Sequence, residues 1–287
     1  MSAQILDGKI LAKNLKEQLK QDIARMKQET TGVPHVVNLM IGRPAESLAY
    51  AASQQRVAQE LGISYALKHL LENMTQPELL GVIQKLNKDS KVHGIMIHKP
   101  FPAQLNYQEA ANAIAIEKDL EGINVANLGR MLLDDMTLVP CTAAAAMEHI
   151  RATGVALRGK EAVIVGVSEI VGKPMMLLLL KERATVTLCH RGTNEAGKLV
   201  EHVGKADIVV VAIGKPEMVK GEWIKKGAIV IDVGINQVNN KLVGDVEYET
   251  AKERAGFITP VPGGVGPVTV VMLMRNVVAA YKRQTSK

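Results

Sequence analysis

Short apolar strands alternate with helical segments along most of this 287-residue chain, and this alternation limits the possible folds more than any single motif. Apolar residues recur at helical spacing, or form short runs bounded by turn residues. The predicted helices cover residues 11–26, 47–61, 77–86 and 267–283, and the predicted strands cover residues 35–41, 64–69, 92–98, 162–165, 185–188, 208–212 and 228–233. This order implies mostly parallel sheets with helices on their faces, so the predicted fold class is α/β.

The alternation occurs twice, which predicts two domains. The second series begins after Pro140-Cys141-Thr142, so we place residues 1–139 in the first domain and residues 140–266 in the second. The last helix, in residues 267–287, is expected to pack back on the first domain and complete it. Asn239-Asn240 lies between short apolar stretches and predicts a hairpin turn.

Composition excludes several classes of protein. The net charge of +6 would suit a nucleic-acid-binding protein, but the lysines are spread along predicted helix faces and only 3% of residues are aromatic. We therefore expect no nucleic-acid partner. The charged start of the chain and the short apolar runs predict neither a signal peptide nor a membrane span, with a cytoplasmic location as the default. Cys141 and Cys189 indicate no disulfide framework, and no residue spacing predicts a metal site.

The segment from Thr259 to Thr269 is unusually dense in backbone-shaping residues. It holds three prolines and three glycines in eleven residues, directly before an apolar helical run. Proline fixes φ, whereas glycine permits positive φ and lets another molecule approach the main chain. The segment predicts a ligand-binding backbone, although a rigid helix-entry turn remains open as an alternative.

A glycine turn follows the first strand of the second domain. Gly166, Ser168 and Gly172 lie between this strand and the next helix, where backbone N–H groups and the helix dipole favour a phosphate. The next strand ends in Cys189-His190-Arg191 without the acidic residue that binds the ribose of NAD. Arg191 therefore favours NADP, unless it is an ordinary surface cation.

Later strand ends carry further glycines. They are Gly214-Lys-Pro216, Asp232-Val-Gly234 and Gly244-Asp245. Because open parallel sheets bind ligands at the carboxyl ends of their strands, the backbone is expected to form a wall of the site.

Together these motifs closely resemble the methylenetetrahydrofolate dehydrogenase/cyclohydrolase family. The matching motifs are Gly166-x-Ser168-x-x-x-Gly172-x-Pro174, Asp232-Val-Gly234-Ile-Asn236, Gly244-Asp245-Val246, Pro260-Val-Pro-Gly-Gly-Val-Gly-Pro267, Ile5-Leu-Asp-Gly-Lys9, Tyr50, Gly94-Ile-Met-Ile-His98, Lys118-Asp-Leu-Glu-Gly122 and Asn127-x-Gly129. The resemblance covers nearly the whole chain. It implies an N-terminal folate domain and a Rossmann-like dinucleotide domain that face each other across a cleft, usually in a homodimer.

The resemblance also implies roles for individual residues. Those implied to bind NADP, with NAD as a possible substitute, are Thr142, Gly166, Ser168, Ile170, Gly172, Arg191, Gly214, Ile235 and Thr269. Those implied to bind the tetrahydrofolate substrate are Tyr50, Glu121, Pro262, Gly263 and Gly264. The catalytic positions are Tyr50, Gln54, His98 and Glu121.

Three of these positions depart from the family pattern. Gln54 replaces a lysine four residues after Tyr50, His98 replaces a glutamine, and Glu121 replaces the aspartate that holds the pterin. The proline and glycine that normally follow Pro-Cys-Thr are also replaced, by Ala143 and Ala145.

The departures favour one of the two family reactions. Hydride transfer from 5,10-methylenetetrahydrofolate depends mainly on positioning, whereas hydrolysis of the methenyl product needs a proton-transfer group, which Gln54 cannot supply. His98 could serve as a base if it reaches the site, and alternation along the strand would aim Lys99 to the opposite face. We therefore expect an NADP-dependent dehydrogenase with weak or absent cyclohydrolase activity. The alternatives are a non-catalytic paralogue that binds a folate or a dinucleotide, and a re-purposed enzyme for a modified pterin carrier.

Overall fold

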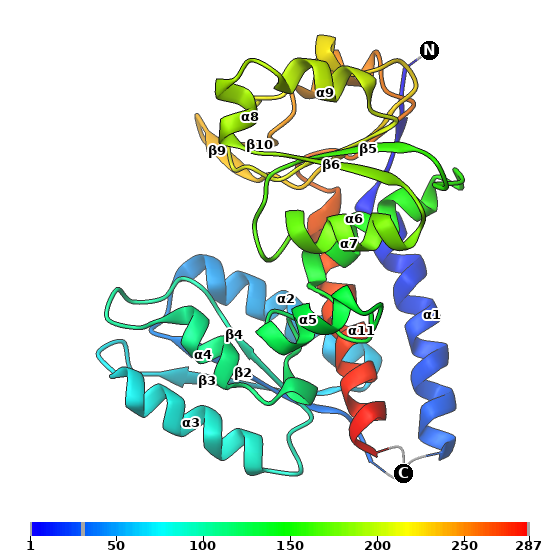
Figure 1. Ribbon diagram of the computed structural model, residues 1–287. Helices are drawn as coiled ribbons and strands as arrows, with labels where there is room; N and C mark the ends of the chain where they lie inside the picture. The colour runs from blue at the N-terminus through cyan, green and yellow to red at the C-terminus, as the bar shows by residue number, and fades with distance from the viewer. Residues whose placement is uncertain (1, 30–31, 286–287) are drawn as a thin grey trace. The chain divides into compact units, whose positions relative to one another are not determined.

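The computed structural model describes residues 2–29 and 32–285, and these residues form two compact units (Figure 1). We call residues 15–139 and 270–285 the three-stranded unit, and residues 2–14 and 140–269 the six-stranded unit, after their main sheets. Long helices α1 (Gly8–Glu29) and α11 (Val265–Thr285) each contribute residues to both units. The predicted domain boundaries at residues 1 and 287 lie outside the described residues.

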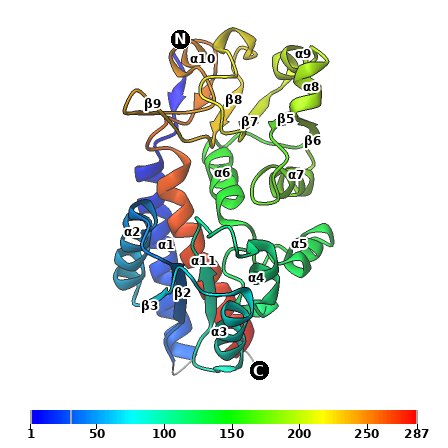
Figure 2. The same ribbon diagram turned by 90° about the vertical axis from the view of Figure 1, so that its left-hand side faces the viewer.

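The three-stranded unit is built on a parallel sheet in the order β3-β2-β4. Its elements are β2 (His35–Ile41), α2 (Ala45–Leu61), β3 (Ser64–Leu70), α3 (Gln76–Lys88), β4 (Gly94–Ile97), α4 (Tyr107–Ala113), η1 (Ile116–Lys118) and α5 (Val125–Leu132). Helices α2 and α3 lie on opposite faces of this sheet (Figures 1 and 2). Leu39 and Ile97 are buried with Leu79 and Ile83 of α3, which forms the core on that face.

The six-stranded unit holds a fully parallel sheet in the order β1-β11-β8-β7-β5-β6. Its strands are β1 (Gln4–Ile5), β5 (Glu161–Val165), β6 (Thr185–Cys189), β7 (Ile208–Val211), β8 (Ile229–Asp232) and β11 (Phe257–Ile258). Its other elements are α6 (Cys141–Ala152), α7 (Gly172–Lys181), α8 (Arg191–Glu195), α9 (Leu199–Lys205), η2 (Gly221–Trp223), α10 (Tyr248–Lys252) and the hairpin strands β9 (Asn236–Val238) and β10 (Lys241–Val243). Figures 1 and 2 show α6 and α7 on one face of the sheet and α8 and α9 on the other.

The predicted α/β class and the predicted strands are confirmed, with small shifts at the ends. The strand expected at residues 92–98 is shorter, since β4 covers only Gly94–Ile97. The hairpin is confirmed as well. Asn239 and Asn240 connect antiparallel strands and have φ values of 49° and 60°, the left-handed backbone that such turns require.

The first residues of the chain do not belong to the same unit as the rest of the predicted first domain. Residues 2–14 belong to the six-stranded unit rather than to residues 15–139, because β1 pairs with β11 through Gln4 opposite Phe257. At the other end, Asn276 of α11 donates to the carbonyl oxygens of Leu120 and Val139 at 2.8 and 2.9 Å. From Val270 onward, the last helix therefore packs within the three-stranded unit.

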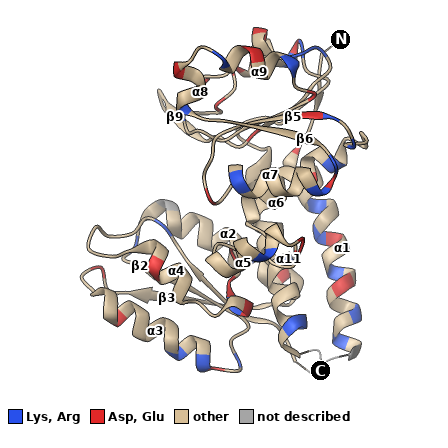
Figure 3. Ribbon diagram, viewed as in Figure 1, with Lys and Arg blue, Asp and Glu red and all other residues tan. Residues whose placement is uncertain are grey.

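Charged residues are dispersed over the surfaces of both units. Figure 3 shows Lys and Arg on several separate helices rather than gathered on one element. Among the residues that the structure describes, no helix is long and apolar enough to span a membrane. Residues 2–29 and 32–285 contain no cluster of three or more His, Cys, Asp or Glu side chains suited to a metal ion.

Candidate active site

Gln54 lies at the centre of a buried, uncharged network in the three-stranded unit. Its side chain, on α2, is wholly inaccessible to solvent. The Gln54 Oε1 atom accepts hydrogen bonds from Asn38 Nδ2 at 2.7 Å and from the Tyr65 hydroxyl at 3.1 Å. Its Nε2 atom lies 3.5 Å from Met96 Sδ. The position that carries a lysine in the resembled family thus holds a neutral amide fixed by neutral neighbours.

His98 belongs to the same network. It follows β4, is 3% exposed, and its Nε2 atom lies 3.4 Å from Asn38 Nδ2. The half-buried Tyr50 ring meets it edge-on, with 6.0 Å between ring centroids. Burial lowers the pKa of His98 to about 4 and raises that of Tyr65 to about 12. Burial thus makes His98 a weaker base than an ordinary imidazole, and its role as a base stays a prediction.

Glu121 lies in a second polar cluster of the three-stranded unit. The Tyr107 hydroxyl of α4 donates to Glu121 Oε2 at 3.4 Å. Burial, followed by the nearby Asp119 carboxyl, raises the pKa of Glu121 to about 7, while Lys99 acts in the opposite direction. Desolvation thus opposes the negative charge of Glu121.

Asp119 supports the Glu121 segment from within the core. Its carboxylate is 1% exposed and accepts hydrogen bonds at 2.8 Å from the Asn124 N–H and from Asn127 Nδ2. Burial raises the pKa of Asp119, and these hydrogen bonds oppose that shift. Asp119 is thus a structural acid that fixes the loop carrying Glu121.

Lys99 has neighbours different from those of His98. Its Nζ atom lies 4.0 Å from the centroid of the Tyr107 ring, and its backbone carbonyl accepts a 2.6 Å hydrogen bond from the Ser47 hydroxyl. Lys99 and His98 thus contact different side chains, as expected from alternation along the strand. Lys99 faces the Glu121 cluster rather than the Gln54 network.

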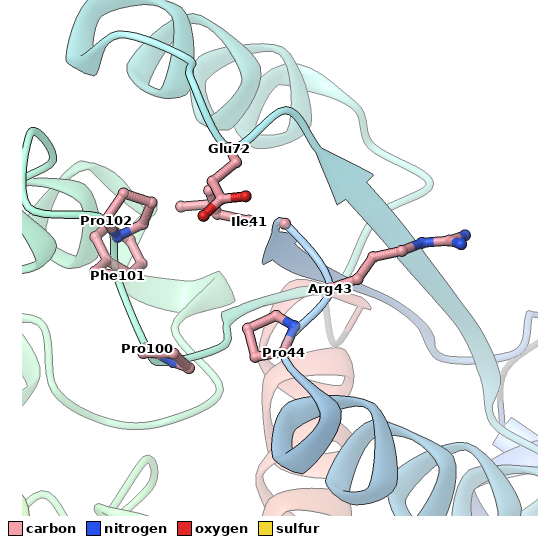
Figure 4. A pocket seen from close by; sticks show the side chains of 8 residues that line it. Ile41, Arg43, Pro44, Glu72, Pro100, Phe101 and Pro102 are labelled. Atoms are coloured by element: carbon pink, nitrogen blue, oxygen red, sulfur yellow. The ribbon is translucent and has the colours of Figure 1, made fainter.

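A pocket of about 480 Å³ opens beside these clusters, and sequence reasoning did not predict it. Figure 4 shows the segment after β4 on one side, the β2–α2 connection on the other, and the Glu72 carboxylate pointing between them, while Arg43 extends away. Its lining consists of Ile41, Gly42, Arg43, Pro44, Glu72, Pro100, Phe101 and Pro102. The proline and phenylalanine walls suit an apolar or aromatic group.

In the six-stranded unit, two glycines shape the turn between β5 and α7. Gly166 has φ of +127°, and a Cβ there would lie 2.2 Å from the Ala212 carbonyl oxygen. A Cβ on Gly172 would lie 2.1 Å from the carbonyl oxygen of Gly166. Only glycine fits either position, so the predicted turn is confirmed as a close backbone crossing.

The neighbouring side chains leave this turn accessible. Ser168 Oγ accepts a hydrogen bond from the Val171 N–H at 3.2 Å, and Ile170 is 42% exposed. Arg191 begins α8 with its side chain 88% exposed, and its Nε atom donates to Glu195 Oε1 at 2.6 Å. Arg191 is thus an available cation whose present partner is an exposed carboxylate on the same short helix.

Two buried carboxylates hold the later strand ends together. Asp245 accepts hydrogen bonds from the backbone N–H groups of Ile213, Gly214 and Lys215 at 2.7 to 2.9 Å. Asp232 accepts from the N–H groups of Gly234, Asp245 and Val246 at 2.8 to 3.1 Å. Burial raises the pKa of Asp232 to about 7 despite these bonds. The sequence noted both acids as strand-end residues but did not predict that they fix three loops.

The remaining predicted cofactor residues are dispersed along this unit. Gly214 has φ of +64° with open space at its Cβ position, and Ile235 is 64% exposed. Thr142 lies in the first turn of α6 and is half-buried. The Thr269 hydroxyl donates to the Val265 carbonyl oxygen at 3.2 Å within α11.

The glycine-rich segment before α11 meets the start of the chain. The Gly8 N–H donates to the Gly263 carbonyl oxygen at 2.9 Å, and a Cβ on Gly8 would collide with the Gly264 carbonyl oxygen. Gly263 has φ of +104°, and Pro262 precedes it. Two motifs from opposite ends of the sequence therefore form one backbone surface within the six-stranded unit.

Sequence reasoning missed Asn38, Tyr65 and Tyr107 as members of these clusters. Asn38 gave a usable signal, because it is a polar residue in the middle of an apolar strand, and a buried amide there requires partners. Tyr65 and Tyr107 gave none, since a tyrosine on a strand or helix is ordinary.

Comparison with known proteins agrees with this arrangement over the whole chain. Residues 6–121 match the catalytic domain, and residues 140–285 the NAD(P)-binding domain, of tetrahydrofolate dehydrogenase/cyclohydrolase. The bifunctional protein FolD of Moorella thermoacetica is 43% identical, covering 99% of this chain and 100% of that protein, and its namesake from Bacillus pumilus is 45% identical, covering 99% of each.

Solved structures give the same result. The bifunctional FolD enzyme of Campylobacter jejuni has a TM-score of 0.93 and 38% identity, covering 98% of this chain and 100% of that one. The Trypanosoma brucei enzyme, solved with NADP and an inhibitor, has a TM-score of 0.93 and 36% identity, covering 100% of both chains. The resemblance is thereby confirmed, and the chain belongs to the tetrahydrofolate dehydrogenase/cyclohydrolase family.

Proposed function

We propose that this protein oxidises 5,10-methylenetetrahydrofolate to the methenyl form with NADP as hydride acceptor. The family membership supports this reaction, as does the NADP bound to the related Trypanosoma brucei enzyme. Hydride transfer requires that the methylene carbon and the nicotinamide C4 be held in line, and no side chain has to accept the hydride. The departures at positions 54 and 98 therefore leave this step available.

We assign the two halves of the ligand set to separate parts of the chain. In this proposal, residues 140–266 bind the dinucleotide, with the Gly166 to Gly172 turn at the pyrophosphate and Arg191 at the 2′-phosphate. Tyr50 and Glu121 bind the folate, which stacks on Tyr50 and donates hydrogen bonds to Glu121. Pro262, Gly263 and Gly264 supply a backbone wall for the substrate.

We further propose that cyclohydrolase activity is weak or absent. The observation that carries this proposal is the complete burial of Gln54 among Asn38, Tyr65 and His98. An amide cannot donate or accept a proton in the required range, and the adjacent imidazole is a weak base. Loss of a general acid or base commonly lowers a rate by about 10² to 10⁴.

We propose a homodimer on the basis of the family resemblance. The proposed cytoplasmic location rests on the sequence pattern. Measurement of the molar mass by light scattering tests the dimer, since a monomer at micromolar concentration would contradict it.

The decisive experiment follows cofactor reduction and the methenyl product separately by absorbance. Purified protein is mixed with 5,10-methylenetetrahydrofolate and either NADP or NAD. Reduced NADP with accumulating methenyl product would support both parts of the proposal. Rapid enzymatic disappearance of the methenyl product would contradict the cyclohydrolase part alone. Tight NADP binding without reduction would contradict the dehydrogenase assignment and favour the non-catalytic alternative.

A further inference from the structure

Glu121 is placed to recognise a donor edge, but its surroundings oppose the charge that such recognition needs. A pterin presents its N3–H and 2-amino groups side by side, and a carboxylate can accept both hydrogen bonds. A protonated carboxyl would present a donor to one of them instead. Asp119 lies in the same segment, so a like charge and burial both act against the Glu121 carboxylate.

Lys99 is the cation of this cluster. Its ammonium lies 4.0 Å from the Tyr107 ring centroid, and the hydroxyl of the same tyrosine donates to Glu121 Oε2 at 3.4 Å. Tyr107 is thus contacted by Lys99 through its ring and by Glu121 through its hydroxyl. The Lys99 charge acts on Glu121 in the direction that favours the carboxylate, as does the Ile97 N–H.

We propose that Lys99 is a positioning residue for folate recognition, acting through Tyr107 and Glu121 rather than on the reacting carbon. The inference rests on the proposed function, because the pterin edge is the group that Glu121 is taken to bind. Lys99 therefore does not replace the missing lysine at position 54. It counterbalances the buried acids so that the substrate meets a hydrogen-bond acceptor.

The groups that face Glu121 define the expected pH dependence. They are Tyr107 from α4, Lys99 after β4 and Asp119 from the same segment. Burial raises the pKa of Tyr107, so its hydroxyl remains a donor at neutral pH. His98 has a pKa of about 4 and does not titrate between pH 6 and 9. The KM for folate should then rise as the pH falls through about 7, where Glu121 takes up its proton.

The test compares Lys99→Met with Lys99→Arg and with the control Lys68→Met, which removes an exposed lysine of β3. We expect Lys99→Met to shift the pH dependence of KM toward higher pH by about one unit, so that KM at pH 7 rises about fivefold. At pH 9 the KM should return to the parental value, with kcat unchanged. Lys99→Arg should retain the parental profile, as should Lys68→Met.

The same Lys99→Met substitution in a Glu121→Gln protein completes a double-mutant cycle. An amide cannot titrate, so Lys99→Met should have no pH-dependent effect on KM there. An unchanged profile in Lys99→Met alone would overturn the inference, as would an equal shift in Lys68→Met. A lower kcat with an unchanged KM profile would place Lys99 on the reacting atoms and overturn it as well.

Failure of the proposed function is detected separately. If the parental protein reduces no NADP, calorimetry with tetrahydrofolate between pH 6 and 9 replaces KM by Kd. If Lys99→Met then shifts the pH dependence of the Kd for tetrahydrofolate, the inference is supported although the dehydrogenase assignment is contradicted. Absence of tetrahydrofolate binding by the parental protein would overturn both.

Discussion

The Gln54 network of the three-stranded unit and the glycine turn of the six-stranded unit build their candidate sites in different ways. The first is made of side chains, among them Asn38, Tyr65 and His98, joined by hydrogen bonds in a buried space. The second is made of backbone, with Gly166 and Gly172 packed against carbonyl oxygens.

This difference explains why the departures at positions 54 and 98 lie among side chains, while Gly166 and Gly172 keep the family pattern. A side-chain site can change its chemistry without changing the chain path, because amide, imidazole and ammonium groups can occupy similar volumes. A backbone site has no such freedom, since any Cβ on Gly166 meets the Ala212 carbonyl oxygen. We therefore expect substitutions to change the proton-transfer chemistry of this protein easily, whereas substitutions at the glycine turn should disrupt dinucleotide binding.

The largest expected effect comes from breaking the backbone site with Gly166→Ala. The new Cβ would collide with the Ala212 carbonyl oxygen, and the alanine would have to adopt the unfavourable φ of +127°. Together these effects should destabilise the unit by about 3 kcal/mol or more. Thermal unfolding and calorimetry with NADP would measure the loss. Gly154→Ala is the control, because its φ of +69° has open space around it and should cost only about 1 kcal/mol. Equal losses in the two variants would refute the distinction.

The next effect comes from restoring proton chemistry with Gln54→Lys and His98→Gln together. The buried Asn38 Oδ1, which has no hydrogen-bond partner within the described residues, offers an acceptor for the new ammonium. We expect methenyl hydrolysis to rise about 100-fold, while dehydrogenase activity changes little. Gln54→Lys alone should gain less, since His98 would remain beside it. No gain in the double variant, with folding intact, would count against position 54 as the cause.

A third effect concerns stability and pH. Burial lowers the pKa of His98 to about 4 from its ordinary 6.5, so the folded state favours the neutral ring. The contribution of the neutral His98 ring to the free energy of unfolding is present above pH 6.5 and is lost as the pH falls toward 4. His98→Gln should therefore reduce the loss of stability between pH 7 and pH 5 by roughly 1 to 2 kcal/mol. Urea unfolding at the two pH values measures it, and identical pH slopes in both proteins would contradict the assignment.

The smallest effect comes from the exposed side chain at the edge of the dinucleotide site. Arg191→Gln should raise the KM for NADP about tenfold and leave that for NAD unchanged, because one charge-assisted contact is lost. Lys198→Gln, at another exposed position of the same unit, is the control. Equal effects of Arg191→Gln on both cofactors would show that Arg191 is an ordinary surface cation.

Much of the fold could be predicted because its signals are local. The apolar runs at residues 35–41 and 208–212 and the Asn239-Asn240 turn depend only on short-range spacing and turn chemistry. The placement of residues 2–14 could not be predicted in this way. It depends on the pairing of Gln4 with Phe257, which lie far apart in the sequence.

The candidate sites divide along the same line. The sequence by itself determined the α/β class, the family, the glycine positions and the absence of a lysine at position 54, since each is written in residue identity and spacing. Only the tertiary structure decided that Gln54 is held by neutral partners, that burial weakens His98 as a base, and that burial raises the pKa of Glu121 while Lys99 opposes the shift. The physical reason is that burial and distant neighbours set the charge of these groups, and neither can be read from the residues alone.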